Sequence, residues 1–178
     1  MDIYQIWTTY NKQWSRYEIL AFTGVLILVC TAMAVRVHRK KLNIIQAAAV
    51  LALVVFLGIV FGSTVFTRTG TIRQYELVPF WSWRDIIRYH DWTLLKENLL
   101  NCILLLPAGV LLPIIANHKV KWYQALAVGI LVSAIIEFSQ LIFMRGLFEW
   151  DDMIHNGLGC MLGSMVTNYI MNVWRKNK

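Results

Sequence analysis

The feature that most restricts the fold of this chain is a series of apolar stretches, each long enough to cross a lipid bilayer as a helix. The hydrocarbon core of a bilayer is about 30 Å thick, and an α-helix needs roughly 20 apolar residues to span it. The sequence therefore predicts an all-α polytopic membrane protein with about five transmembrane helices. The five stretches are 17–35, 44–66, 94–116, 125–143 and 153–173.

The composition fits a membrane protein better than a soluble one. Of the 178 residues, 58% are hydrophobic and 15% are charged, whereas about a quarter of the residues in a soluble domain are charged. The net charge of +7 lies mainly at the ends of apolar stretches, where orientation signals and anionic headgroups explain it more simply than nucleic acid does. The three cysteines fall in three different stretches without metal-ligand spacing. We therefore expect membrane lipids as partners, and no nucleic acid, metal or cofactor.

The polar segments divide the chain into four parts. Residues 1–16 repeat apolar side chains at alternating four- and three-residue spacing, which predicts either a helix lying in the membrane interface or an extension of the first span. Residues 17–66 form two N-terminal transmembrane helices. Residues 67–173 form a membrane domain of three helices, preceded by an aromatic-rich loop that lies on the membrane surface. Residues 174–178 are a basic tail.

Basic residues predict the orientation. The loop 36–41 carries four of them, 117–124 carries two and the C-terminal tail carries three. With five spans these segments share one side, which the positive-inside rule makes cytoplasmic. We therefore expect an outside N-terminus and a cytoplasmic C-terminus, although Lys12 and Arg16 argue mildly for the reverse.

Ionisable and amide side chains at membrane depth are expensive, and such residues suggest a functional site. One group opens the third span, a second lies in the fourth span and a third opens the fifth, so the predicted topology places all three in the outer half of the bilayer. We expect one shared polar pocket, with Arg145, and also Arg84 or Arg88, offsetting the carboxylates. The alternative is that these side chains only hold helices together. The residues of the expected pocket are Glu97, Asn98, Asn101, Glu137, Gln140, Arg145, Asp152 and Asn156, with His155 at its rim.

Proline and glycine residues predict helix geometry in the same spans. Pro107 lacks a backbone donor and should kink the third span. Gly109 permits close approach by a neighbouring helix, and Gly159 and Gly163 form a small-xxx-small pattern that suits close helix packing.

The stretch 77–163 resembles the VanZ-like family, named for a teicoplanin-resistance accessory protein. The matching segments are LVPF, ENLLNCILLLPAGVLLP, EFSQ and RGLFEWDDMIHNGLGCMLG, in that order. The family pattern has an aromatic residue where this chain has Leu105, and an aspartate where it has Glu149. The matched positions are Asn101, Leu105, Pro107, Gly109, Glu137, Gln140, Arg145, Glu149, Asp152, Asn156 and Gly159. The resemblance thus adds Glu149 to the expected pocket.

The resemblance implies resistance to teicoplanin-type lipoglycopeptides in a Gram-positive cell membrane, but no mechanism. One interpretation is a non-catalytic resistance or envelope factor whose pocket binds a lipid or the amphiphilic antibiotic. Another is an intramembrane enzyme that acts on a lipid-linked envelope precursor, with Glu97, Glu137 and Asp152 as acid and base or as ligands of a hard divalent ion. A transporter is the weakest interpretation, because the sequence shows no second half-repeat.

Overall fold

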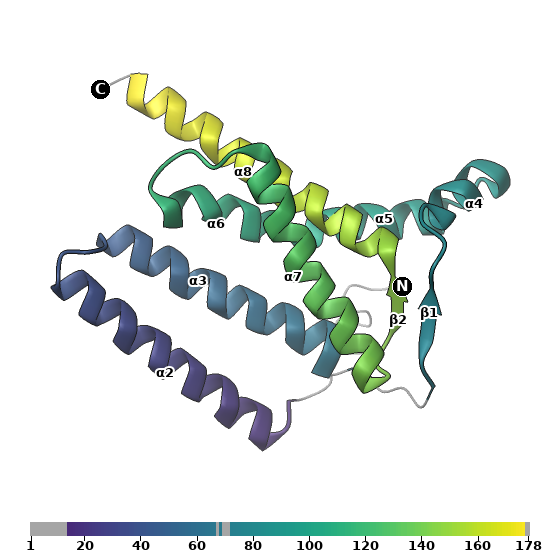
Figure 1. Ribbon diagram of the computed structural model, residues 1–178, viewed down its shortest axis with the longest axis horizontal. Helices are drawn as coiled ribbons and strands as arrows, with labels where there is room; N and C mark the ends of the chain where they lie inside the picture. The colour runs from purple at the N-terminus through teal and green to yellow at the C-terminus, as the bar shows by residue number, and fades with distance from the viewer. Residues whose placement is uncertain (1–13, 67, 69–71, 177–178) are drawn as a thin grey trace.

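The computed structural model describes residues 14–66, 68 and 72–176, which form a bundle of helices and two short strands (Figure 1). The interfacial helix expected within 1–16 falls almost entirely outside the described residues. The elements are α2 (Arg16–His38), α3 (Ile44–Phe61), the π-helical turn η1 (Gly62–Phe66), β1 (Gln74–Glu76), α4 (Trp81–Tyr89), α5 (Trp92–Leu104), α6 (Leu106–Ala116), α7 (Trp122–Phe143), β2 (Leu147–Glu149) and α8 (Trp150–Lys176).

Four helices among the described residues are long and apolar enough to cross a membrane, and they match the first four predicted spans. They are Arg16–His38, Ile44–Phe66, Trp92–Ala116 and Trp122–Phe143. The predicted all-α polytopic fold is thereby confirmed. The fifth predicted span lies within α8, which is a helix of 27 residues but does not meet the same criterion of apolarity. A fifth crossing therefore remains a prediction.

The third predicted span consists of two helices rather than one. The chain leaves helical geometry at Leu105, whose side chain is fully buried, and α6 begins at the next residue. Pro107 is the second residue of α6, a position where its missing N–H leaves no helical hydrogen bond unmade. The break thus lies where the proline prevents α5 from continuing.

Helix α8 packs along α7, α6 and α5, and glycines bring it into backbone contact with them (Figure 1). A Cβ atom built on Gly159 would collide with the carbonyl of Cys102 in α5, and one on Gly163 would collide with the carbonyl of Leu106 in α6. Gly109 leaves the same kind of space for the carbonyl of Cys160. Larger side chains at these positions would force the helices apart.

The two N-terminal helices lie at the other edge of the bundle (Figure 1). Helix α3 packs against α6, and α2 packs against α3. Helix α2 has no buried residue along Arg16–His38. In a membrane most of its surface would therefore face lipid or another molecule.

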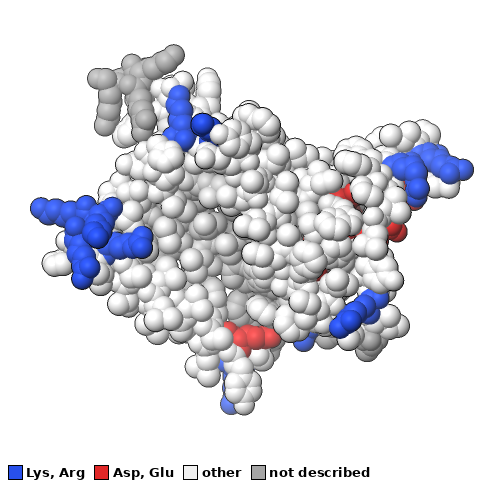
Figure 2. Space-filling model, in the orientation of Figure 1, with Lys and Arg blue, Asp and Glu red and all other residues white. Residues whose placement is uncertain are grey.

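The bundle has two chemically different ends. One end, called the polar end, holds α4, the starts of α5 and α8, the end of α7, and the parallel pair β1–β2 (Figure 1). The other, called the basic end, holds the loop between α2 and α3. Lysine and arginine atoms gather there, at the left of Figure 2.

Close packing of α8 predicts that Gly159→Ala destabilises the protein, whereas Gly24→Ala does not. Overpacking a filled interface costs about 1–3 kcal/mol, while a Cβ on Gly24 in α2 would have no neighbour within 4 Å. Both changes place alanine in a helix and gain the same propensity of up to about 1 kcal/mol, so their difference reports packing. The measurement is the thermal unfolding midpoint in detergent. Equal midpoints would contradict the backbone contact.

Candidate functional site

The three polar groups expected from the sequence lie together at the polar end. They come from α5, α7 and α8, and they bond with one another and with the start of α4. We call this set the polar cluster, and it comprises Ser82, Asn98, Asn101, Ser133, Glu137, Gln140, Glu149, Asp151, Asp152 and Asn156.

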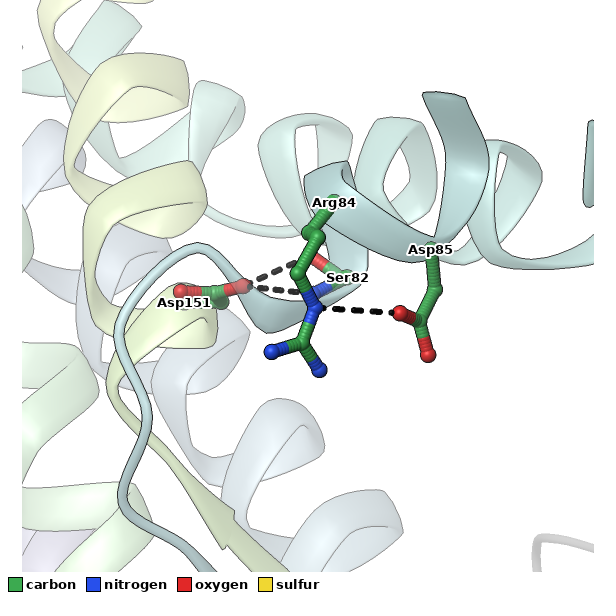
Figure 3. A network of polar contacts seen from close by, with 4 residues as sticks. All are labelled: Ser82, Arg84, Asp85 and Asp151. Carbon is green, nitrogen blue, oxygen red and sulfur yellow. Dashed lines mark hydrogen bonds and ion pairs between the residues drawn. The ribbon is translucent and has the colours of Figure 1, made fainter. Parts of the chain in front are cut away.

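Asp151, the second residue of α8, holds the start of α4 (Figure 3). Its carboxylate accepts the backbone N–H of Phe80 at 2.5 Å, the N–H of Ser82 at 3.3 Å and the hydroxyl of Ser82 at 2.6 Å. Asn98 of α5 donates to the same hydroxyl at 3.1 Å. Asp151 is 2% exposed, so polar groups of Phe80, Ser82 and Asn98 gather around one buried carboxylate.

The start of α4 needs this carboxylate because it has no cap of its own. Phe80 precedes the helix in the left-handed conformation, with φ of 60°, and offers no side-chain hydrogen bond. A non-glycine residue in that conformation costs about 1–2 kcal/mol. A carboxylate near the first N–H groups of a helix is favourable because of the helix dipole. Asp151 thus acts as an N-cap supplied by another helix.

A second attachment joins α4 to α8 one turn further on. The indole N–H of Trp83 donates to Nε2 of His155 at 2.8 Å. His155 is 3% exposed, so the prediction that it lies at a pocket rim is wrong. Because Nε2 accepts a hydrogen bond, the imidazole is neutral in this arrangement.

Asp152 and Asn156 connect α8 to α5 and α7. The side-chain amide of Asn101 donates to the carboxylate of Asp152. Asn156 donates to the Ser133 hydroxyl at 2.9 Å, and that hydroxyl lies 3.4 Å from the Asp152 carbonyl. These contacts join all three helices at one depth.

Glu137 is buried in α7, with 2% of its surface exposed. Its carboxylate accepts the backbone N–H of Glu149 at 3.1 Å, which attaches the strand β2 to the helix. One turn later, Gln140 donates to the carbonyl of Thr64 in η1 at 3.3 Å. Glu137 and Gln140, the first and last residues of the EFSQ segment, thus bind backbone groups of two other segments.

The prediction that Arg145 offsets the carboxylates is wrong. Its guanidinium donates to the backbone carbonyls of Phe66 at 2.5 Å and Arg68 at 3.0 Å. The physical reason is the turn after α7, where Met144 adopts a left-handed conformation and Arg145 follows the end of the helix. The side chain there meets carbonyls near the end of η1 rather than a carboxylate.

Arg84 and Arg88, the other cations expected to offset the carboxylates, contact different groups. Arg84 pairs with Asp85 at 3.3 Å, and this is the only ion pair among the side chains of residues 14–66, 68 and 72–174 (Figure 3). Arg88 lies over the ring of Tyr89. Glu97 is exposed on α5, where it makes no hydrogen bond to the cluster, but its charge acts on Asp152 and Glu149.

The cation that acts on the cluster is Arg68, which our sequence analysis did not identify. Its charge interacts favourably with both Glu137 and Asp152. Its Nε is buried without a hydrogen-bond partner. Because Arg145 binds the carbonyl of Arg68, Arg145 acts on the cluster by positioning that residue. The sequence offers no signal for this role, since Arg68 resembles any basic residue that follows a span.

Glu149 lies in β2, outside the membrane-spanning segments, and is only partly buried. Burial raises the pKa of its carboxyl from 4.5 to about 7, and the nearby carboxylates of Asp152 and Asp151 act in the same direction. Its Oε1 is buried without a hydrogen-bond partner. With its pKa at about 7, Glu149 is about half protonated near neutral pH.

The described residues contain no group of three or more His, Cys, Asp or Glu side chains arranged to hold a metal ion. The two cavities that we describe lie along α2, away from the polar cluster. The cysteines Cys30, Cys102 and Cys160 are free thiols. The chemistry of the polar cluster therefore rests on carboxylates, amides, hydroxyls and one guanidinium.

A family model for VanZ/LLP1 matches residues 44–172. The chain belongs to the VanZ/LLP1 family. The resemblance noted over 77–163 is confirmed and extends to the first residue of α3, so the match includes the whole polar cluster and excludes α2. Neither the curated proteins nor the solved structures with which this VanZ/LLP1 protein was compared include a match.

The contacts of Asp151 predict that Asp151→Asn loosens α4 in this VanZ/LLP1 protein. Hydrogen bonds to a charged group contribute about 1.5–3 kcal/mol each, so losing one should speed amide exchange along α4 about tenfold or more. Hydrogen–deuterium exchange of residues 80–89 in detergent measures this effect. Asp85→Asn is the matched control, since it removes a carboxylate of α4 whose partner is the exposed Arg84. Equal exchange in both variants would refute the capping role.

The raised pKa of Glu149 predicts stability that falls as pH rises. The folded protein keeps this proton up to about pH 7, whereas the unfolded chain releases it near 4.5. The contribution is therefore fully present below about pH 4.5 and is lost as pH approaches 7. The measurement is the unfolding midpoint across this window for the natural protein and Glu149→Gln. The variant should show a shallower fall, and parallel profiles would contradict the assignment.

Proposed function

We propose that this protein lowers the sensitivity of a Gram-positive cell to teicoplanin-type lipoglycopeptides by binding the amphiphile, or a lipid, at the polar end of the bundle. The observation that carries the proposal is the attachment of α4 to a buried cluster of carboxylates through Asp151 and His155. An amphipathic helix that carries aromatic side chains, as α4 does, is suited to meet an acylated drug at a membrane surface.

The number of buried charges argues for more than helix association. Glu137 and Asp151 are each 2% exposed, and Arg68 is the cation that interacts favourably with Glu137 and Asp152. Interhelical hydrogen bonds in membranes contribute on average about 0.6 kcal/mol, whereas a charge at membrane depth costs at least about 2.5 kcal/mol. Neutral side chains could join the helices at lower cost. The carboxylates therefore support a functional role for the polar cluster.

The surface of α4 and the residues beside it supports the choice of ligand. Ile87 is 75% exposed, Tyr89 66% and Trp92 74%. Aromatic side chains prefer the boundary between lipid and water, where the acyl chain of a lipoglycopeptide also concentrates. Because the cluster side chains bond to one another, we place the ligand against α4, over the cluster rather than within it.

The same proposal includes an orientation. The polar end would face outward, because the loops 36–41 and 117–124 belong to the opposite end and carry six basic residues between them. Such loops are retained in the cytoplasm. A ligand that arrives from outside would then reach α4 directly.

An enzyme that acts on a lipid-linked envelope precursor is the second candidate. The observation that favours it is the electrostatic interaction between Glu137 and Asp152, two buried carboxylates beside Arg68. Neighbouring carboxylates in unlike surroundings are typical of acid–base pairs. Such an enzyme would alter the cell wall itself rather than meet the drug.

One experiment separates these functions. A susceptible Gram-positive host that expresses the chain should tolerate more teicoplanin and little more vancomycin, because only the acylated drug concentrates at the membrane. The measurement is the minimal inhibitory concentration of each drug. Equal protection against both would favour altered wall precursors and the enzyme, and protection against neither would refute the resistance function.

The same assay identifies the working carboxylates. Glu137→Gln and Asp152→Asn should abolish tolerance while the protein still accumulates in membranes, because each removes a charge and keeps the shape. Glu18→Gln is the matched control, since Glu18 lies in the first turn of α2, far from the cluster, and a glutamine there can still accept the backbone N–H of Ser15. If both cluster variants accumulated normally and gave full tolerance, the carboxylates of the cluster would serve only to hold the helices together.

A further inference from the structure

A groove of about 740 Å³ lies along the C-terminal half of α2, at the basic end of the bundle. Apolar side chains form one part of it and cations form the other. The apolar part consists of Leu28, Ala32, Val35 and Leu42 with the methyl-bearing Thr31, and the cations are Arg36, Arg39 and Lys41. Its residues precede the region of the family match, which starts at residue 44, so the family offers no role for it.

The cations of the groove have no carboxylate to neutralise them. No aspartate or glutamate lines it, and among the side chains described in 14–66, 68 and 72–174 the single ion pair joins Arg84 to Asp85 at the other end of the molecule. Three positive charges beside an apolar wall are complementary to a ligand that has an anionic head and a hydrocarbon tail. A phosphate group would satisfy the planar donors of two arginines.

The length of the groove fits one leaflet of a membrane. From Leu28 to Arg39 the helix rises about 16 Å at 1.5 Å per residue. Half of the hydrocarbon core is about 15 Å. A fatty acyl chain that runs beside Leu28 and Ala32 would therefore place its headgroup at the level of Arg36 and Arg39.

We propose that this groove binds one anionic phospholipid, with its phosphate on Arg36, Arg39 and Lys41 and an acyl chain along Leu28, Ala32 and Val35. The site is separate from the polar cluster and does not depend on the function proposed for it. If the cations served only to keep this loop in the cytoplasm, the charges would be enough and an apolar groove beside them would not be needed. The lipid would also cover a part of α2 that has no buried residue of its own.

Native mass spectrometry of the purified full chain in detergent tests the proposal. The probes are dioleoylphosphatidylglycerol and dioleoylphosphatidylcholine, which differ in headgroup charge but share their acyl chains. The natural protein should retain one phosphatidylglycerol in preference to phosphatidylcholine. Each basic residue near an anionic lipid contributes about 1 kcal/mol, so Arg39→Gln with Lys41→Gln should weaken retention about 30-fold.

Two matched controls separate the groove from general positive charge. Lys119→Gln with Lys121→Gln removes the same charge from the other basic loop and should leave retention unchanged. Ala32→Trp fills the apolar wall and should weaken retention with all cations present, whereas Ala21→Trp, on an exposed part of α2 outside the groove, should not.

Three results would overturn the proposal. Equal retention of the two lipids would exclude an anionic headgroup site. If Lys119→Gln with Lys121→Gln weakened phosphatidylglycerol retention as much as Arg39→Gln with Lys41→Gln, the binding would depend on nonspecific positive charge. A dimer without bound lipid, disrupted by Ala32→Trp, would show that a second copy of the chain occupies the groove.

Discussion

Helix α8 carries too many polar side chains to face lipid, and the arrangement of the bundle follows from shielding it. Thr167 donates to the carbonyl of Val110 at 2.9 Å, and Asn168 exchanges hydrogen bonds with the backbone of Val120. Gly159 and Gly163 let α5 and α6 approach until backbones touch. Each polar group at membrane depth would otherwise cost several kcal/mol. Helices α5, α6 and α7 therefore pack around α8, and α3 joins the bundle through α6.

This packing also places the polar cluster and α4. The starts of α5 and α8 and the end of α7 lie at one end of the bundle (Figure 1), so the side chains that open or close these helices meet there. Asp151 and His155 stand at the first turns of α8 and bind the segment that precedes α5. Helix α4 and the buried carboxylates thus form one connected unit.

The sequence predicted the positions of the membrane helices, but it did not predict the partners of the charged side chains. Apolar length located four membrane helices, and Pro107 indicated where α5 and α6 separate. The ion pairing expected for Arg145 was wrong, because the direction of a long side chain depends on the turn at Met144 and on carbonyls left open at the end of η1. Glu97 was assigned by spacing along one helix, and it lies on the exposed face of α5, from which only its charge acts on Asp152 and Glu149.

By itself, the sequence determined that the chain forms membrane helices, where they begin and end to within a few residues, and that its costly polar groups lie near the ends of three of them. These properties depend on hydrophobic length and local pattern, which act within one segment. Only the tertiary structure decided that Arg68 serves the carboxylates, that Asp151 caps α4, and that three cations border an apolar groove on α2. The contacts of Arg68 and Asp151 join residues far apart in the chain, and their geometry is set by loops and helix contacts that no local pattern records. The groove lies within the single segment 28–42, but it forms only because the turn after α2 places Lys41 and Leu42 beside the helix.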